Sequence, residues 1–127
     1  MGESGSELLA KFEAFELGPD EFGHRQHVEV AYEMLRKYGF LKTMSKFPAD
    51  IKTFATNVGA PKKFHVTITI AFLSLIAERM RVTETNDFDS FAAANEDLFE
   101  IDILKRWYST ERLTSDVART QFLLPDR

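Results

Sequence analysis

Three histidines are the side chains of this 127-residue chain whose spacing best suits chemistry. His24 and His27 stand three residues apart, a spacing that brings two side chains together on one face of a helix. His65 lies in a second stretch with helical spacing, and the chain has no further histidine. Three imidazoles can bind a divalent zinc, copper, nickel or iron ion and leave a position for water or a small molecule. We therefore predict that these three histidines form a catalytic metal site.

Two other hypotheses fit the same histidines. In a metal-free enzyme or ligand-binding module, one histidine would serve as a base in a pocket lined by some of the twelve phenylalanines. In a non-enzymatic interaction or structural protein, each ring would be a core side chain that is satisfied by a backbone carbonyl or a hydroxyl group. The histidines favour an enzyme over a structural protein, and they leave the reaction class open.

Four residues near the histidines are candidates for binding a substrate. Arg25 and Lys63 stand close to them in the sequence, and their positive charges would suit an anionic group beside a helix start. Thr69 and Phe72 share a helical face with His65, at about 40° and about 20° from it in projection. Thr69 also has a competing role, because a buried threonine often donates to a carbonyl of its own helix.

The composition excludes several other kinds of site. The chain contains no cysteine, which rules out a disulfide, a thiolate zinc site, an iron–sulfur cluster and a thiol nucleophile. Its 16 basic and 20 acidic residues give a net charge of −4, which argues against a general nucleic-acid binder. The sequence also lacks the Walker A, GxGxxG, GxSxG and HExxH motifs of nucleotide-binding proteins, serine hydrolases and zinc proteases.

Hydrophobic spacing predicts the elements that position these residues. Apolar side chains recur at helical intervals along most of the chain, which indicates an all-α, compact, single-domain bundle of about six helices. Residues 1–6 are expected to be a flexible segment, and residues 7–127 are expected to form one helical domain. The predicted helices cover residues 7–15, 23–38, 40–58, 61–80, 88–94 and 101–108, with a last short helix after Ser109.

The fourth of these segments is ambiguous at its start. The run from Val66 to Ile70 alternates and is β-branched throughout, which locally favours a strand. The segment continues to Met80 without a break, and this length suits a buried central helix better than a strand. A helix also places His65 beside the other two histidines. Arg79 lies roughly 21 Å further along that helix, so we expect it to form a buried ion pair with a Glu or Asp side chain instead.

Several apolar side chains are expected to face the core. Phe15, Leu41 and Ile101 continue the apolar stripes of the first, third and sixth predicted helices. Pro48 would bend the third helix or split it in two. The apolar tail from Phe122 to Pro125 is expected to dock on the bundle.

The chain lacks the sequence features of a membrane or secreted protein. No apolar run reaches the length of about 18 residues that a membrane span needs, and no signal peptide is recognisable at the N-terminus. We therefore expect a cytoplasmic protein that acts on a small-molecule ligand and has no membrane or nucleic-acid partner. A homodimer is compatible with each of the three hypotheses.

Four segments of the sequence form a recognisable pattern. They are Phe22–Val28 (FGHRQHV), Lys63–Phe72 (KFHVTITIAF), Trp107–Leu113 (WYSTERL) and Phe122–Asp126 (FLLPD). Together they resemble a group of small, uncharacterised bacterial all-helical proteins with an FxHRxHV and KFHxTxTxAF pattern. The resemblance covers most of the chain and implies a compact helical fold and a bacterial origin, but no activity, cofactor or catalytic residue. Thr110 stands where the similar proteins often have proline, a departure that concerns a helix start.

Overall fold

The computed structural model describes residues 5–127, which form seven α-helices and four 3₁₀ turns and contain no strand. The prediction of an all-α bundle is therefore confirmed for this part of the chain. Of the N-terminal segment predicted to be flexible, Gly5 already begins the first helix, and residues 1–4 lie outside the described residues. The α-helices are α1 (Gly5–Glu13), α2 (His24–Tyr38), α3 (Phe40–Asn57), α4 (Val66–Val82), α5 (Phe88–Ala94), α6 (Thr110–Leu113) and α7 (Asp116–Thr120). The 3₁₀ turns are η1 (Pro19–Glu21), η2 (Pro61–Lys63), η3 (Glu96–Phe99) and η4 (Ile103–Arg106).

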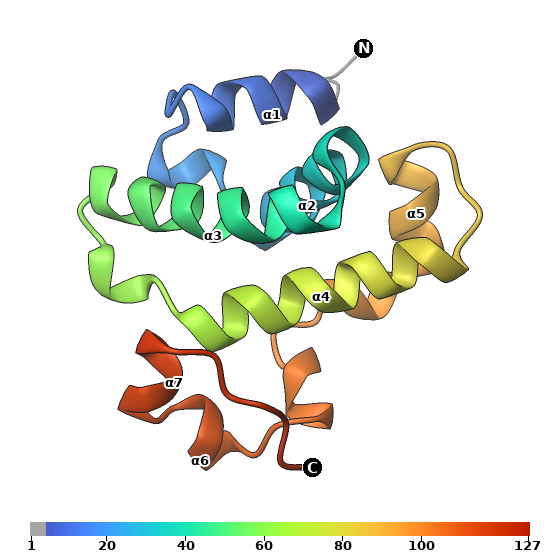
Figure 1. The fold of residues 1–127 in the computed structure, drawn as a ribbon. Helices are drawn as coiled ribbons and strands as arrows, with labels where there is room; N and C mark the ends of the chain where they lie inside the picture. The colour runs from blue at the N-terminus through green and yellow to red at the C-terminus, as the bar shows by residue number, and fades with distance from the viewer. Residues whose placement is uncertain (1–4) are drawn as a thin grey trace.

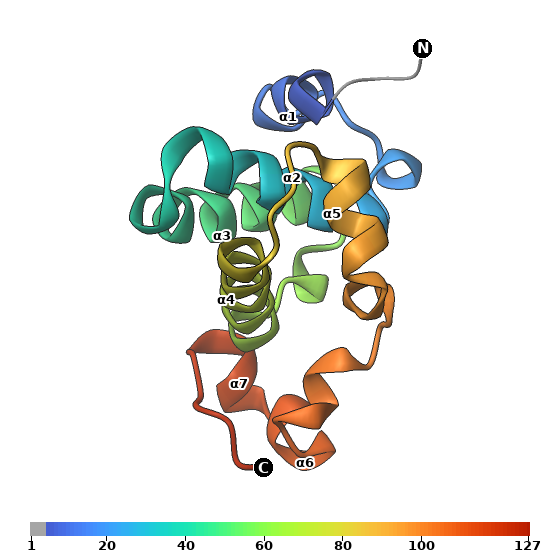
Figure 2. The same cartoon turned by 90° about the vertical axis from the view of Figure 1, so that its right-hand side faces the viewer.

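The helices stack in layers, and α4 lies in the middle of the stack (Figure 1). Helix α1 packs on one side of the pair α2 and α3, and α4 crosses the other side of that pair. Beyond α4 lie α6, α7 and the C-terminal tail, while α5 sits beside α2 (Figure 2). Because α4 contacts N-terminal helices on one side and C-terminal ones on the other, its sequence is apolar on most sides.

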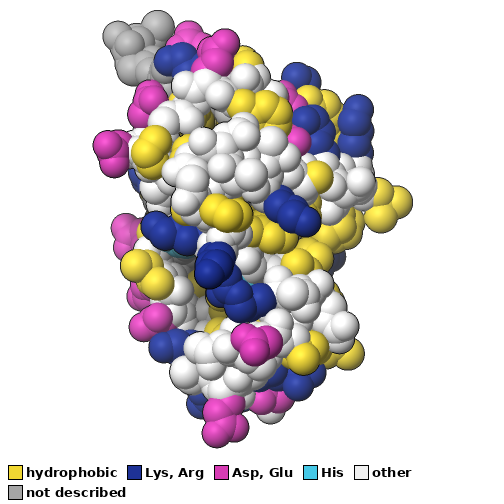
Figure 3. Space-filling view, turned by 90° about the vertical axis from the view of Figure 1, so that its left-hand side faces the viewer, with side chains coloured by type: hydrophobic (Ala, Val, Ile, Leu, Met, Phe, Trp, Pro, Cys, Tyr) yellow, Lys and Arg dark blue, Asp and Glu magenta, His cyan; other side chains and the backbone are white. Residues whose placement is uncertain are grey.

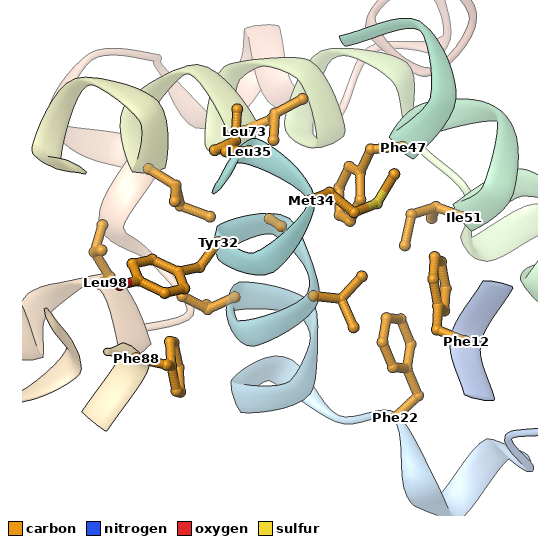
Figure 4. Close-up of a cluster of buried hydrophobic side chains, with 14 of the residues drawn as sticks. Phe12, Phe22, Tyr32, Met34, Leu35, Phe47, Ile51, Leu73, Phe88 and Leu98 are labelled. Atoms are coloured by element: carbon orange, nitrogen blue, oxygen red, sulfur yellow. The ribbon is translucent and has the colours of Figure 1, made fainter. Parts of the chain in front are cut away.

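Helix α2 runs through the centre of the core. Side chains of α1 and α3 pack on one side of it, and side chains of α5 and η3 pack on the other (Figure 4). Six residues of α2 are buried, more than a single helical stripe supplies, and they are Val28, Val30, Ala31, Tyr32, Met34 and Leu35. Burying one large apolar side chain stabilises a fold by roughly 1.5–3 kcal/mol. This one helix therefore contributes a large part of the stability.

The ambiguous fourth segment is a helix, as predicted. His65 is the N-cap of α4, and residues 66–82 are helical throughout. Burial against neighbours on two sides outweighs the local β-propensity of this stretch, because such propensities span only about 1 kcal/mol. Pro48 lies inside α3 and does not split that helix.

Three side chains expected in the core are exposed instead. Phe15 is 40% exposed because it lies just beyond the end of α1, with a φ of 57° in the left-handed region. Leu41 is 82% exposed because it is the second residue of α3, at the corner where α2 gives way to α3. Ile101 is 87% exposed because only the turn η4 forms in the segment predicted as a helix. The last predicted helix is also divided, since Ser115 caps a second start at α7.

The C-terminal tail docks on the bundle, as predicted. The Thr67 hydroxyl of α4 donates to the Gln121 carbonyl at 2.8 Å and accepts the Leu123 N–H at 3.1 Å. The Tyr108 hydroxyl donates to the Leu123 carbonyl at 2.8 Å. These bonds use the polar side chain of Thr67 in tertiary structure and fasten the end of the chain to α4.

Arg79 forms the predicted ion pair, with Asp97 of η3 as its partner, but the pair is partly exposed and not buried. The Asp97 carboxylate accepts two hydrogen bonds of 2.8 Å from the Arg79 guanidinium and one of 2.9 Å from Arg106. The bonds from Arg79, followed by those from Arg106, hold the pKa of Asp97 well below its usual range. The pair joins the far end of α4 to η3.

Candidate functional site

The ring of His65 is fully engaged in backbone hydrogen bonds. Its Nδ1 accepts the N–H of Ile68 at 3.1 Å, which makes His65 the N-cap of α4. Because Nδ1 is an acceptor, the proton of the neutral ring is on Nε2, which donates to the Leu113 carbonyl at 2.7 Å. The side chain is buried, and both nitrogens are occupied. His65 therefore joins the start of α4 to the end of α6.

His24 uses one ring nitrogen in a similar way. Its Nε2 donates to the Leu98 carbonyl at 2.9 Å. The ring packs against Phe72 of α4 and Phe99 of η3, with centroids 5.2 and 6.4 Å away. His24 therefore links the first turn of α2 to two elements that are distant in the sequence.

The three histidines are not gathered into one set of ligands. Within residues 5–127, no three His, Asp or Glu side chains meet closely enough to hold a metal ion. His24 and His65 direct Nε2 at different backbone carbonyls, and His27 packs on the ring of Phe22. This arrangement gives no support to a centre in which all three bind one ion. The metal site stays a prediction, and elemental analysis tests it.

Arg25, one of the predicted substrate-binding residues, is engaged on the side of α2 that faces α5 and η3. Its guanidinium lies over the rings of Phe88 and Phe99, 5.1 and 5.4 Å from their centroids. It also contacts the Asp89 carboxylate at 3.4 Å. Arg25 is not among the residues that line a cavity with Lys63, so the two positive charges do not share one pocket.

The other three predicted substrate-binding residues also fall in different places. The Thr69 hydroxyl donates to the carbonyl of His65 at 2.6 Å, which is the competing role foreseen for it. Phe72 packs against the ring of His24. Among the four candidates, Lys63 alone lines a cavity together with a histidine, and that histidine is His27.

The pocket that contains His27 and Lys63 has a volume of about 320 Å³. It lies between the start of α2, the second half of α3 and the turns η1 and η2. Its other lining side chains are apolar, and no Asp or Glu lines it. A mainly apolar cavity of this size with a few polar groups is typical of small-molecule sites. The lining residues are Pro19, Phe22, His27, Ile51, Phe54, Ala55, Val58, Ala60, Lys63 and Phe64.

The ring of His27 has no hydrogen-bond partner among residues 5–127. It packs against Phe22, with the ring centroids 4.2 Å apart. Every fully buried side-chain nitrogen or oxygen in the described part of the chain has a partner. The ring nitrogens of His27 must therefore be accessible, and the cavity that this ring lines is where a small molecule would reach them. A neutral imidazole ring offers a ligand one N–H donor and one acceptor nitrogen.

Burial sets the protonation state of His27. Burial, and to a smaller degree the charge of His24 one turn earlier, lowers the pKa of His27 from 6.5 to about 4. The imidazole is therefore neutral at pH 7. A neutral ring is a good hydrogen-bonding group, whereas a base with so low a pKa is poorly matched to proton transfer at neutral pH.

Local contacts fix the wall of the pocket that carries His27. Gly23 is the N-cap of α2, and the side chain of Gln26 accepts the Gly23 N–H at 3.0 Å, which holds the first turn of the helix. Phe22 packs against Phe54 of α3, with centroids 4.8 Å apart. The ring against which His27 stacks is thus itself held between two helices.

The opposite wall follows from the way α3 ends. Gly59 adopts a φ of 77°, a conformation that glycine reaches without strain, and the Ala60 N–H donates to the Ala55 carbonyl at 2.8 Å. The chain then enters η2, where Pro61 occupies the first position and the Lys63 N–H donates to the Ala60 carbonyl at 3.0 Å. This turn brings Lys63 back to the cavity.

Two other hollows in the described part of the chain are larger. One of about 380 Å³ includes His65, but both nitrogens of that ring are already bonded. The other, of about 430 Å³, runs along α4 to Trp107 and has no histidine in its lining. Of these three cavities, the His27 pocket is therefore the one that is lined by an imidazole without a partner among the described residues.

Phe22 and Phe54 are pocket residues that the sequence does not single out. Helical spacing marks Phe54 as a core-facing residue, and Phe22 stands before the start of α2 in a segment without periodicity. Their role depends on how α3 packs against the loop after η1, which no local pattern encodes. The sequence predicts that some phenylalanines line an apolar pocket, but it does not indicate which ones.

Comparison with protein families, curated proteins and solved structures finds no match to this chain. The resemblance to bacterial helical proteins therefore stays a prediction. Among residues 5–127, no helix is long and apolar enough to cross a membrane. Fold and pocket together define a small all-α protein with one candidate ligand site, at His27.

Proposed function

We propose that this protein is a metal-free module that binds a small, mainly apolar molecule in the His27 pocket. The observation that carries the proposal is the His27 ring, which faces an apolar cavity without a hydrogen-bond partner. Because the ring nitrogens are accessible, a ligand in the cavity can pair with the imidazole in place of water. The apolar body of the same ligand would be buried against the apolar lining, which is the favourable part of binding.

The chemistry of the pocket favours binding over catalysis. At pH 7 the neutral His27 ring donates one hydrogen bond and accepts another, which suits a hydroxyl group on the ligand. Three phenylalanines supply flat apolar walls, and they are Phe22, Phe54 and Phe64. The ligand class that fits is therefore a compact aromatic or branched apolar molecule with one polar end.

A direct test uses 2-naphthol as a probe and follows thermal unfolding and amide chemical shifts. At a free probe concentration of ten times Kd, the free energy of unfolding should rise by about 1.4 kcal/mol. Val58→Trp fills the cavity with a large side chain and should abolish the effect, because Val58 lines the pocket. Val117→Trp is the matched control, since Val117 is 51% exposed and lies outside this pocket.

The results distinguish binding in the His27 pocket from binding elsewhere. Shifts confined to the residues around His27, present in Val117→Trp and absent in Val58→Trp, support the proposal. Binding that persists in Val58→Trp, or shifts centred on the groove along α4, would place the ligand elsewhere and overturn it. Absence of any binding by 2-naphthol and by related aromatic alcohols would also overturn it.

A further inference from the structure

We propose that the ligand of the His27 pocket is an apolar monocarboxylate whose carboxylate is held by Lys63. This inference rests on the proposed function and names the class of ligand. Lys63 is the one charged side chain in the lining, apart from the titratable ring of His27. A pocket whose fixed charge is a single ammonium group selects for a single negative charge.

Lys63 has no acidic partner within the described part of the chain. Its ammonium forms no ion pair or side-chain hydrogen bond among residues 5–127. Some cations of the protein are paired, as Arg79 is with Asp97 and Lys46 is with Glu13 and Asp50. Lys63 differs from the other exposed lysines in that it lines the cavity, where a ligand carboxylate would meet no competing acidic side chain of residues 5–127.

The arrangement of the pocket would also fix the orientation of the ligand. Lys63 is an exposed residue of η2 that also lines the cavity, so a carboxylate that it binds would keep part of its hydration. The phenylalanine walls accept the apolar body, and the His27 ring offers an N–H donor without the cost of a second charge. The two polar groups and the apolar walls thus match an amphipathic acid, with one polar end and one apolar end.

The surface around this part of the molecule is compatible with an anion. Figure 3 shows the side of the molecule on which α3 ends and η2 begins, and Lys and Arg side chains gather across the middle of this face beside hydrophobic ones. The protein as a whole carries a charge of −4, so this concentration of positive charge is local. A local positive field would favour the approach of an anion to the pocket.

The test compares 2-naphthoate with 2-naphthamide, which has nearly the same shape and no charge, by calorimetry at low salt. We expect the carboxylate to bind about fivefold more tightly, the upper range for an ion pair in contact with water. Lys63→Met should remove this preference, so that this variant binds the acid and the amide with equal affinity. Lys62→Met is the control, because Lys62 is also exposed on η2 and does not line the pocket. Added salt should weaken the preference in the wild type.

The results test the carboxylate proposal and the pocket separately. Equal affinity for the acid and the amide, with no effect of Lys63→Met, would overturn the carboxylate proposal and leave the pocket standing. Binding of neither compound, together with a failure of 2-naphthol, would overturn the pocket itself. An equal loss in Lys62→Met and Lys63→Met would show a diffuse surface effect and would contradict the role given to Lys63.

Discussion

The low pKa of His27 predicts that the protein loses stability in mild acid through this one residue. In the unfolded chain the imidazole has its ordinary pKa of 6.5, whereas in the folded protein burial lowers the pKa to about 4. Between these values the unfolded state binds the proton and the folded state does not. The stability that neutral His27 contributes is therefore complete above pH 6.5 and is lost progressively as the pH falls toward 4.

The magnitude follows from the two pKa values. The free energy of unfolding should fall by about 2 kcal/mol between pH 8 and pH 5, and by about 3 kcal/mol at pH 4, from this group alone. Acidic residues with lowered pKa values, such as Glu13 and Asp97, add their own losses at low pH. The difference between wild type and His27→Gln isolates the histidine, because glutamine does not titrate.

Urea unfolding followed by circular dichroism at several pH values measures this difference. The wild type should lose about 2 kcal/mol more than His27→Gln between pH 8 and pH 5. His24→Gln is the control: it should retain most of the loss, since burial rather than His24 is the main cause of the shift. Parallel curves for the wild type and His27→Gln would refute the view that the folded protein keeps the His27 ring neutral in mild acid.

Three other predictions test the contacts around the site. Thr67→Val removes both hydrogen bonds to the tail; it should lower the free energy of unfolding by about 1–3 kcal/mol and speed amide exchange at Leu123, and unchanged exchange would refute the docking role. Asp97→Asn should cost about 1 kcal/mol in urea unfolding at pH 7, because the pair with Arg79 is partly exposed, and equal stability would show that the pair contributes nothing. Elemental analysis of the untagged protein should find no stoichiometric metal, whereas an ion that is lost in His27→Ala would support the three-histidine metal site instead.

Local signals in the sequence were sufficient for most of the helices. Gly23 and Gly39 bound α2, Asp87 caps α5, and Ser109 caps α6, as helix-start and helix-end chemistry predicts. The failures are in short segments. Apolar spacing around Ile101 does not distinguish a full helix from a single 3₁₀ turn, because such a stretch contains too few turns to show a period.

The candidate site was predictable only in part. The spacing of His24 and His27 correctly placed both at the start of one helix, and His65 at the start of another. The hydrogen-bond partners of His24 and His65 could not be predicted, because the Leu98 and Leu113 carbonyls come from segments far along the chain. Tertiary packing alone decides which imidazole donates a hydrogen bond to a backbone carbonyl and which one lines a cavity.

The central claim is that His27 is the histidine that meets a ligand in the cavity, with neither ring nitrogen bonded to residues 5–127, and imidazole nitrogen chemical shifts test it directly. Protein labelled with ¹⁵N in its histidine side chains would be titrated with 2-naphthol at pH 7. The ring nitrogens of His27 should shift and saturate, while those of His65 should stay fixed because both are bonded to the backbone. A saturating titration that leaves His27 unchanged, or that moves all three histidines equally, would contradict this claim.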